Sequence, residues 1–339
     1  MATIKEVARR ARVSVGTVSN VLSGAVPVSE RLKERVLRVI QDLDYHPNHV
    51  ARSLKIRQTK MLGMVVSDIT NAFFPLVVRG AEDAAWKHNY MLITFNSDDQ
   101  PEREKQVLSA LRARRVDGIL LVAATTDGDL SHIQGTIDAG IPVVCLDRVI
   151  ESIPVDCLSV DNVAGARKGV EHLIAQGHRR IGILTGPLSV QVACDRLEGY
   201  RQALRAAGIP EDENLIGNGA FRAEVGYAAS LPLLKHGRPT AVFTSNAMMT
   251  LGLLKALNEF DLRCPEDVSI VTFDDPVFSQ SVRPELTCVA QPAYELGFRG
   301  AETLIHRLMR PDTTHVNLHL DTELRLRQST APAALAVGG

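Results

Sequence analysis

The chain has 339 residues, of which 45% are hydrophobic and 23% are charged, a composition typical of a soluble globular protein with two or three domains. Its net charge of −1 conceals an uneven distribution. Residues 1–60 contain 12 Lys and Arg against 5 Asp and Glu, whereas the remaining residues contain 26 against 34. A basic head on an acidic body indicates that the head binds a polyanion.

Neither a metal centre nor a membrane segment is expected. The five cysteines are scattered and lack a C-x-x-C pair, so they predict no disulfide framework, zinc site or cofactor. No apolar run approaches about 18 residues, and the N-terminus is charged from Lys5 onward, which is unlike a signal peptide. We therefore expect a cytoplasmic protein with no membrane partner.

The first 46 residues predict three short helices. Thr3 and Glu6 have the spacing of a capping box, which begins a helix. After a turn of about three residues, Ser14 caps a second helix, and Ser29 caps a third. Two short helices joined by a tight turn and supported by a third are the helix-turn-helix layout, whose second helix lies in the DNA major groove.

Small polar side chains on the second helix suit DNA contact. Asn20 is the best candidate for reading a base, because Asn pairs bidentately with adenine, and the hydroxyls of Ser14 and Ser19 suit phosphates. Any small three-helix bundle shows similar apolar stripes, so the excess of basic residues is what favours DNA. The predicted DNA contacts of the head are Ser14, Val15, Gly16, Thr17, Ser19, Asn20 and Ser29.

A short basic segment, PNHVARSLK, follows the head at residues 47–55. It is too basic for a core and too short to form a stable isolated helix. Its apolar residues Val50, Ala51 and Leu54 nevertheless share one side of a helix. The segment therefore predicts a helix that needs a partner surface in order to fold.

From Met61 onward, seven short apolar runs alternate with helical segments. Strands that are apolar throughout and alternate with helices predict parallel sheets covered on both faces, and seven units are too many for one small domain. We predict an α/β core of two lobes, each a doubly wound parallel sheet. The runs are MLGMVV, YMLITF, GILLVA, PVVCL, IGILTG, AVFTS and VSIVTF.

Polar residues follow nearly every one of these runs, where open α/β sheets bind ligands. Asp, Asn and Arg bond hydroxyl groups, and an aromatic ring stacks on a pyranose or a purine, so the set predicts a small-molecule cleft. Single members have simpler explanations: Ser97 and Asp161 as helix caps, Arg196 in a surface ion pair, and one of the two phenylalanines as core. The predicted ligand contacts are Asn71, Phe73, Phe74, Asp98, Asp147, Arg148, Arg196, Asn246 and Asp275.

The chain lacks the common catalytic motifs. It contains no G-x-x-x-x-G-K-[ST], H-E-x-x-H, G-x-S-x-G or G-x-G-x-x-G, and its ten histidines are scattered. A binding protein is therefore expected, and an enzyme that uses the carboxylates of the cleft is a less favoured alternative.

The segments TIKEVARRARVSVGTVSNVLSG, VSERLKERVLRVIQDLDYHPNHVARSLK and GMVVSDITNAFFPLVVRGAEDAA resemble the LacI/GalR family of bacterial transcription regulators. The likeness continues through RRVDGILLV, DNVAGARKGVEHLIAQGHRRIGIL and VSIVTFDD to about residue 327. It implies a small all-α helix-turn-helix domain at 1–46, a hinge at 47–60, and a periplasmic-binding-protein-like core at 61–329. The implied lobes are 61–159 with 290–321 and 160–289 with 322–329, and residues 330–339 form a flexible tail.

The resemblance also implies a function. Such proteins are repressors that bind a palindromic operator in double-stranded DNA as homodimers, under the control of a small-molecule effector. We expect a sugar or sugar derivative, with a purine or nucleoside as the alternative effector, and a solute-binding protein for transport as a less favoured alternative class. In the family the hinge folds in the minor groove and a leucine kinks the duplex. The implied hinge contacts with DNA are Asn48, His49, Ala51, Arg52 and Leu54.

Three positions depart from the family pattern. Arg12 stands where the turn usually has glycine, Asn20 stands where Arg is common, and Ala247 follows Asn246 where Asp is usual. No leucine heptad follows residue 327, so we expect a dimer without a tetramerising coil.

Overall fold

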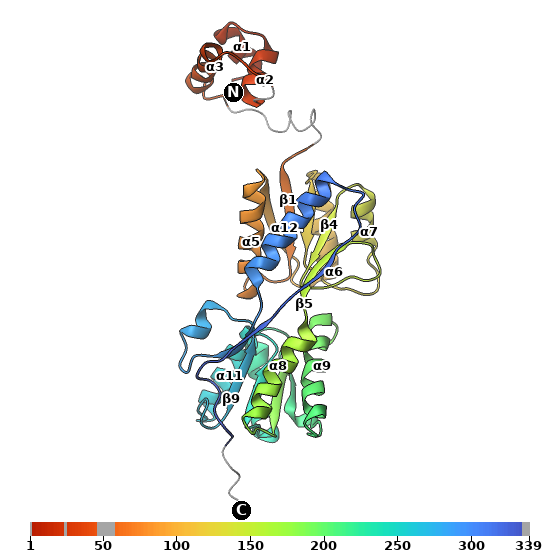
Figure 1. The fold of residues 1–339 in the computed structure, drawn as a ribbon, viewed down its shortest axis with the longest axis vertical. Helices are drawn as coiled ribbons and strands as arrows, with labels where there is room; N and C mark the ends of the chain where they lie inside the picture. Colours follow the sequence, from red (N-terminus) through yellow and green to blue (C-terminus); the bar gives the residue numbers. More distant parts are fainter. Residues whose placement is uncertain (1, 24–25, 46–57, 334–339) are drawn as a thin grey trace, which may run out of the picture. The chain divides into compact units, whose positions relative to one another are not determined.

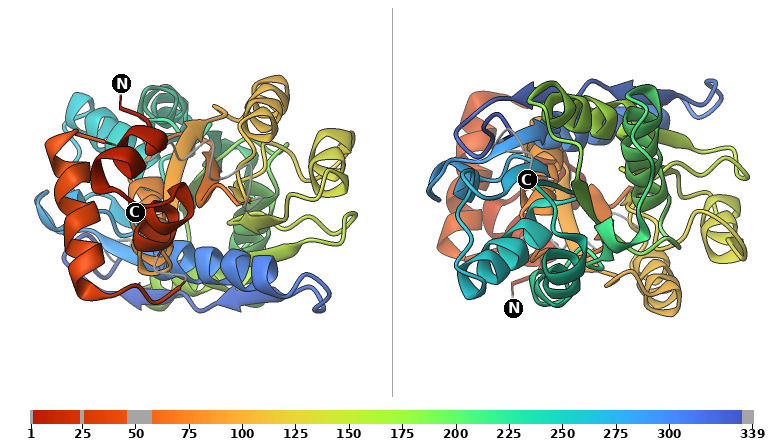
Figure 2. Two further views of the ribbon diagram at one scale, coloured as in Figure 1. Left: turned by 90° about the horizontal axis from the view of Figure 1, so that it is seen from above. Right: turned by 90° about the horizontal axis from the view of Figure 1, so that it is seen from below.

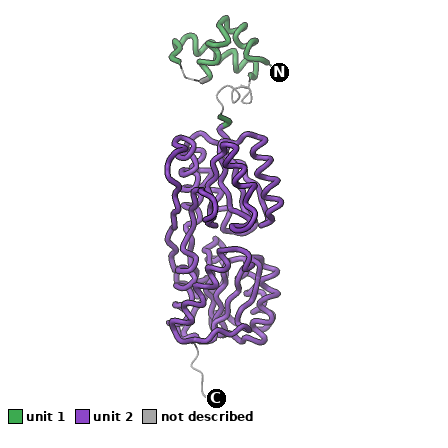
Figure 3. The backbone as a smooth tube through the Cα atoms, turned by 90° about the vertical axis from the view of Figure 1, so that its right-hand side faces the viewer, with its two compact units in different colours: residues 1–59 green, residues 60–339 purple. Residues whose placement is uncertain are grey.

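The computed structural model describes residues 2–23, 26–45 and 58–333. The chain forms two compact units, residues 1–59 and residues 60–339 (Figure 3). No helix of the described residues is long and apolar enough to cross a membrane. The predicted hinge contacts Asn48, His49, Ala51, Arg52 and Leu54 lie outside the described residues.

The first unit is a bundle of the three predicted helices. They are α1 (Ile4–Ala11), α2 (Val15–Ser23) and α3 (Glu30–Asp42). Val7, Val18 and Val36, one from each helix, are fully buried and form its centre. At the start of α1, the Thr3 hydroxyl accepts a hydrogen bond from the Glu6 backbone, as the capping box predicts, while the Glu6 carboxylate pairs with Arg9 and Arg10.

The second unit contains two six-stranded sheets, one in each lobe. The order of the first sheet is β11-β5-β4-β3-β1-β2, and the order of the second is β12-β10-β9-β8-β6-β7. All the strand pairs are parallel except β10 with β12. The strands of lobe 1 are β1 (Met61–Val66), β2 (Met91–Asn96), β3 (Gly118–Leu121), β4 (Val143–Leu146), β5 (Asp156–Val160) and β11 (Asn317–Leu320), and those of lobe 2 are β6 (Ile181–Thr185), β7 (Ile216–Asn218), β8 (Ala241–Thr244), β9 (Ser269–Phe273), β10 (Thr287–Ala290) and β12 (Glu323–Arg325).

The seven apolar runs all form strands, and their parallel register aligns their carboxyl ends. In lobe 1, Val65 of β1 lies opposite Phe95 of β2 and Leu121 of β3. In lobe 2, Thr244 of β8 lies opposite Leu184 of β6 and Thr272 of β9. Residues that follow these strands therefore meet at one edge of each sheet.

Helices cover both faces of each sheet, as predicted (Figure 1 and Figure 2). In lobe 1, α5 and α12 pack together on one face, and α6 and α7 on the other. In lobe 2, the pairs are α8 with α9 and α10 with α11. The helices are α5 (Phe73–Lys87), α6 (Pro101–Ala113), α7 (Ser131–Asp138), α8 (Asn162–Ala175), α9 (Gln191–Ala206), α10 (Ala223–Pro232), α11 (Ala247–Glu259) and α12 (Ala293–Met309).

The chain passes between the lobes at three crossings, which join β5 to α8, β10 to α12, and β11 to β12 (Figure 1). Lobe 1 therefore contains α12 and β11, which come from the end of the chain. A change in the angle between the lobes must bend all three crossings at once, because none of them is a free linker.

Residues 330–333 differ from the predicted flexible tail. The Ala333 amide donates to the Gln176 carbonyl at 2.8 Å, and the Ala331 carbonyl accepts from Nε2 of His178 at 3.0 Å. The Thr330 hydroxyl contacts Nε2 of His172 at 3.0 Å. These bonds hold the segment against lobe 2, so the ordered chain continues past residue 329.

Two glycines let α5 and α12 touch through their backbones. A Cβ on Gly80 would overlap the Tyr294 carbonyl oxygen, and a Cβ on Gly297 would overlap the Val77 carbonyl oxygen, at separations that real Cβ atoms do not show. The lobe 1 layer therefore depends on the absence of side chains at both positions.

We predict that Gly80→Ala or Gly297→Ala lowers the free energy of unfolding of the second unit by about 1–3 kcal/mol, because the helices must separate to admit a methyl group. Urea denaturation measures the change. Gly135→Ala is the matched control, since a Cβ there would meet only a side-chain atom of Arg112 at 3.9 Å. It should instead gain about 0.5–1 kcal/mol from helix propensity. Equal effects at all three glycines would contradict the close crossing.

Candidate functional site

The start of α2 presents an open, uncharged surface. The Ser14 hydroxyl accepts a hydrogen bond from the Thr17 amide at 3.0 Å and lies 2.9 Å from the Thr17 hydroxyl. Ser14 thus caps α2, and the cap holds both side chains in place. Val15 and Gly16 are exposed, and a Cβ on Gly16 would meet only the Ser14 hydroxyl. Ser19 is exposed and Asn20 is half-buried. Of the predicted contacts on this helix, those in its first turn are therefore the most open.

The turn before α2 and the helix α3 carry exposed basic residues. Arg12 is exposed and has a left-handed backbone, with φ 50°, which favours glycine. Ser29 precedes α3, but its hydroxyl makes no capping hydrogen bond, contrary to the role predicted for it. The exposed basic residues of α3 are Arg31, Lys33, Arg35 and Arg38.

A cavity of about 50 Å³ lies in the second unit, where the carboxyl ends of the strands of both lobes meet. Seven of the nine predicted ligand contacts line it: Asn71, Phe73, Phe74, Asp147, Arg148, Arg196 and Asn246. The other lining residues are Ser67, Asp68, Asp99, Val192, Ala220, Phe221, Arg222, Asp274 and Gln291.

Arg196 of α9 is the central cation of this cleft and is only 4% exposed. Its Nε donates to the Asn162 carboxamide oxygen at 2.8 Å, and its Nη1 donates to the Ser245 carbonyl at 2.5 Å. Its guanidinium carbon lies 3.8 Å from the centroid of the Phe273 ring. These contacts exclude the simpler explanation of a surface ion pair and fix the guanidinium on the lobe 2 side of the cleft.

Two buried aspartates occupy equivalent places in the lobes. Asp147 directly follows β4 with φ 68°, and Asp274 directly follows β9 with φ 75°. Such backbone angles are strained for residues other than glycine, and strain of this kind is typical of functional sites. Burial raises the pKa of both carboxyls; Arg148 and Arg196 oppose the shift at Asp147, and Arg196 and Gln291 oppose it at Asp274.

Several buried polar atoms of the second unit lack a hydrogen-bond partner. Arg148 binds the Ala123 carbonyl at 2.6 Å and Asp99 at 2.8 Å through Nη1, whereas its Nε makes no hydrogen bond and lies 3.9 Å from the Asp147 carboxylate. Unpaired buried groups are costly and rare in native proteins. The unpaired atoms among the described residues all lie at or just after the ends of strands: Arg148 Nε, Thr185 Oγ1, Ser245 Oγ and Gln291 Oε1. Of these four residues, Arg148 and Gln291 line the cavity.

The aromatic residues form one wall of the cleft. Phe73 and Phe74 pack edge to face with centroids 5.1 Å apart, and both are buried in the lobe 1 core as well as lining the cavity. Phe221 was missed from the sequence, since it lies in a loop outside every apolar run. Its ring packs on Gly186, where a Cβ would overlap it.

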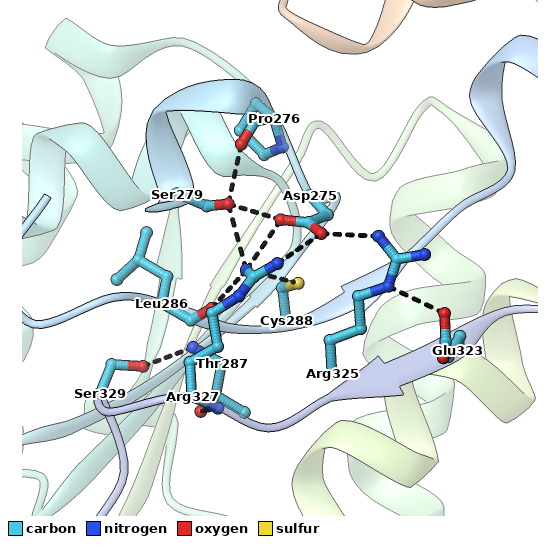
Figure 4. Close-up of polar contacts among 10 residues, drawn as sticks. All are labelled: Asp275, Pro276, Ser279, Leu286, Thr287, Cys288, Glu323, Arg325, Arg327 and Ser329. Atoms are coloured by element: carbon cyan, nitrogen blue, oxygen red, sulfur yellow. Dashed lines mark hydrogen bonds and ion pairs between the residues drawn. The ribbon is translucent and has the colours of Figure 1, made fainter. Parts of the chain in front are cut away.

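Two predicted ligand contacts are not brought to the cavity. The Asp98 carboxylate pairs with Arg103 on the surface, and its neighbour Asp99 lines the cavity instead. Asp275 turns away from the cavity and binds Arg325 and Arg327 (Figure 4). In each pair the choice between adjacent aspartates depends on backbone angles that the residue types do not reveal.

The simpler explanations offered for two other residues have different outcomes. The Asp161 carboxylate caps α8 by accepting the Ala164 amide at 2.8 Å, as expected. Ser97 is buried and donates to the Val66 carbonyl at 3.3 Å, so it ties two strands together and caps no helix.

A helix-turn-helix unit joined to a two-lobed α/β core with a polar cleft defines a DNA-binding regulator that senses a small molecule. The family profile described as bacterial regulatory proteins, lacI family, matches residues 3–48, and the profile of a periplasmic binding protein-like domain matches residues 170–330. The chain belongs to the lacI family of bacterial regulatory proteins. It is therefore a transcriptional regulator and neither an enzyme nor a transport protein.

Named relatives and solved structures agree with this assignment. The ribose operon repressor of Haemophilus influenzae is 37% identical over 97% of this chain and 98% of its own length. The HTH-type transcriptional repressor PurR of Vibrio atlanticus is 36% identical over 92% of this chain and 93% of its own. The solved structure of a lac repressor dimer bound to operator and an anti-inducer matches this chain with a TM-score of 0.86. The two are 29% identical, and the match covers 97% of this chain and 99% of the other.

We predict that Asp274→Asn stabilises the ligand-free second unit at neutral pH. The raised pKa means that ionised Asp274 is disfavoured in the folded state. The free-energy cost of ionising this carboxyl is absent below the unfolded pKa of about 4 and grows as the pH rises through the folded pKa. The advantage of Asn over Asp should therefore grow with pH. Thermal unfolding between pH 4 and pH 8 measures it.

Asp267→Asn is the matched control for this pH profile. Asp267 is an exposed lobe 2 carboxylate whose pKa is lowered by hydrogen bonds from the backbone and side chain of Arg263. Its stabilising effect is present above about pH 4, so the control should lose stability where Asp274→Asn gains it. The same sign in both variants would contradict the assignment.

Proposed function

We propose that this protein is a sugar-responsive repressor that binds a palindromic operator as a homodimer and takes a monosaccharide such as ribose as its effector. The observation that carries the proposal is the set of buried charged and polar side chains that line the cavity, among them Asp147, Arg148, Arg196 and Asp274. Carboxylates and guanidinium groups bind vicinal hydroxyls, and a flanking ring stacks on the apolar face of a sugar. The names of the ribose operon repressors, at up to 37% identity, support ribose as the first sugar to test.

In this proposal the cleft residues act either as hydrogen-bond acceptors or as hydrogen-bond donors. Asp147 and Asp274 accept hydrogen bonds from hydroxyls, while Arg148 and Arg196 donate to sugar oxygens. The phenylalanine wall excludes water from one face of the ring. Each lobe contributes an aspartate and an arginine, so a bound sugar links the lobes directly.

In this proposal the head and the hinge bind the operator. The α2 surface enters the major groove, with Asn20 as the candidate base reader, and the hydroxyls of Ser14 and Ser29 meet phosphates. A sugar that changes the lobe arrangement changes how the hinges of a dimer meet, so sugar affinity and operator affinity are linked reciprocally. The dimer in the operator complex of the lac repressor supports this arrangement.

We predict that D-ribose binds the wild-type protein and that Arg196→Met weakens binding at least thirtyfold. Removing one partner of a buried charged network costs about 2–5 kcal/mol. Isothermal titration calorimetry measures the affinity. Arg201→Met, on the same helix but in an exposed pair with Glu211, is the matched control and should bind ribose normally.

The same titration separates the effector classes. D-ribose, D-glucose, cellobiose and hypoxanthine are each tested, and a ligand at 100 times its Kd should also stabilise the fold by about 2.7 kcal/mol. Binding of hypoxanthine alone would replace the sugar proposal with the purine alternative. Operator affinity with and without the bound compound, measured on duplexes selected from random sequence, then gives the sign of the response.

We predict that Leu54→Ala weakens binding to selected operator duplexes and leaves ribose affinity unchanged, because an intercalating leucine stabilises the kinked duplex and the cavity is lined by residues of the second unit. Fluorescence anisotropy on the operator and calorimetry with ribose give the two affinities. Leu188→Ala, at a leucine 55% exposed in lobe 2, is the control and should alter neither. Parallel loss of both affinities in Leu54→Ala would show that this residue serves only the fold.

A further inference from the structure

Two consecutive aspartates at the end of β9 point in different directions. The left-handed backbone of Asp274 turns its carboxylate into the cavity, where it accepts a hydrogen bond from Nε2 of Gln291 at 2.5 Å. The carboxylate of Asp275 points away from the cavity and into a cluster of polar groups (Figure 4). Asp274 and Asp275 therefore form hydrogen bonds with different parts of the chain.

The Asp275 carboxylate is almost fully enclosed, with a side chain 5% exposed. Arg327 donates to it through Nη1 and Nη2 at 2.8 and 2.7 Å, and Nη1 of Arg325 donates at 2.8 Å. The Ser279 hydroxyl donates at 2.5 Å. Burial raises the pKa of this carboxyl, but the hydrogen bonds from Arg327, Ser279 and Arg325 outweigh it and hold the pKa well below its usual range. The group is therefore a permanent anion.

The partners of the two aspartates lie on one crossing between the lobes and, within lobe 2, just after another. Gln291 lies between β10 and α12, on the second crossing. Arg325 ends β12 and Arg327 follows it, immediately after the third crossing. Arg327 is tied further to lobe 2, because its Nη1 also donates to the Leu286 carbonyl at 2.8 Å (Figure 4). Asp274 and Asp275 thus form hydrogen bonds with residues at or next to two of the three connections between the lobes.

We propose that Asp275 is a positioning residue for the cleft: by anchoring the third crossing to the loop behind Asp274, it holds the Asp274 carboxylate and Gln291 in the geometry that receives the sugar. The identity of the sugar rests on the function proposed above. The role of Asp275 does not, because its contacts are within the chain. The permanent charge suits this role, since an anchor must not titrate while the cleft is in use.

The alternative is that Asp275 only stabilises lobe 2. Both ideas predict a lower unfolding temperature when the carboxylate is lost. They differ at Gln291, which is not among the hydrogen-bond partners of the Asp275 carboxylate. A positioning residue affects the second crossing, whereas a merely structural residue affects only its own bonding partners. Hydrogen exchange of backbone amides in the native protein reports this local opening.

The test compares Asp275→Asn with Asp267→Asn in the full chain. Both variants remove one carboxylate of lobe 2 that binds arginine, but Asp267 pairs with Arg263 on the surface, away from the crossings. Hydrogen exchange of residues 290–293 is measured without ligand, and D-ribose affinity is measured by calorimetry. Asp275→Asn should raise the exchange rate of this segment at least tenfold and weaken ribose binding at least tenfold. Asp267→Asn should change neither by more than twofold.

Exchange and affinity within twofold of wild type in Asp275→Asn would overturn the proposal, even if the unfolding temperature falls. If wild type does not bind ribose, the sugar proposal fails, and the exchange measurement alone decides the role of Asp275. Arg325→Gln is the second variant should Asp275→Asn fail to fold, because the Arg325 side chain is 48% exposed and supplies only one of the bonds to the carboxylate. It should show the same pattern with a smaller change, and no change at residues 290–293 would count against the anchor.

Discussion

The burial of the Arg196 guanidinium between the lobes is the constraint on which the cleft depends. A buried charge is costly unless other charges and hydrogen bonds compensate it. Burial lowers the pKa of Arg196, and Asp274 of lobe 2 and Asp147 of lobe 1 are the main opposing influences. The cation is thus shared by carboxylates from both lobes.

Residues of the cleft are also bonded to the connections between the lobes. The lobes are joined at three crossings, and the first and second of these carry Asn162 and Gln291, which bind Arg196 and Asp274. Groups that face the ligand are therefore bonded to the connections that must bend when the lobes move.

Much of this architecture follows from local patterns in the sequence. The seven apolar runs predict the inner strands, because a parallel sheet covered on both faces buries every side chain of such a strand. Strands β7, β11 and β12 lie at or near sheet edges, are partly exposed and were not predicted. The buried strand β5 was also missed, since its Asp156 looks unsuitable for a core until Arg307 is seen to bind it at 2.8 and 2.9 Å.

The sequence by itself determined the class of protein: a basic helical head, two parallel sheets, and polar residues at their carboxyl ends. These features depend on periodicity and on charge, which are local properties. Only the tertiary structure decided which of two adjacent aspartates enters the cleft. Asp274 lines the cavity and Asp275 binds the crossing strand, because a left-handed backbone angle reverses the alternation of side chains that an extended strand would give. The partners of the two side chains, such as Arg327 for Asp275 and Gln291 for Asp274, come from distant parts of the chain, and no local pattern of residue types reveals them.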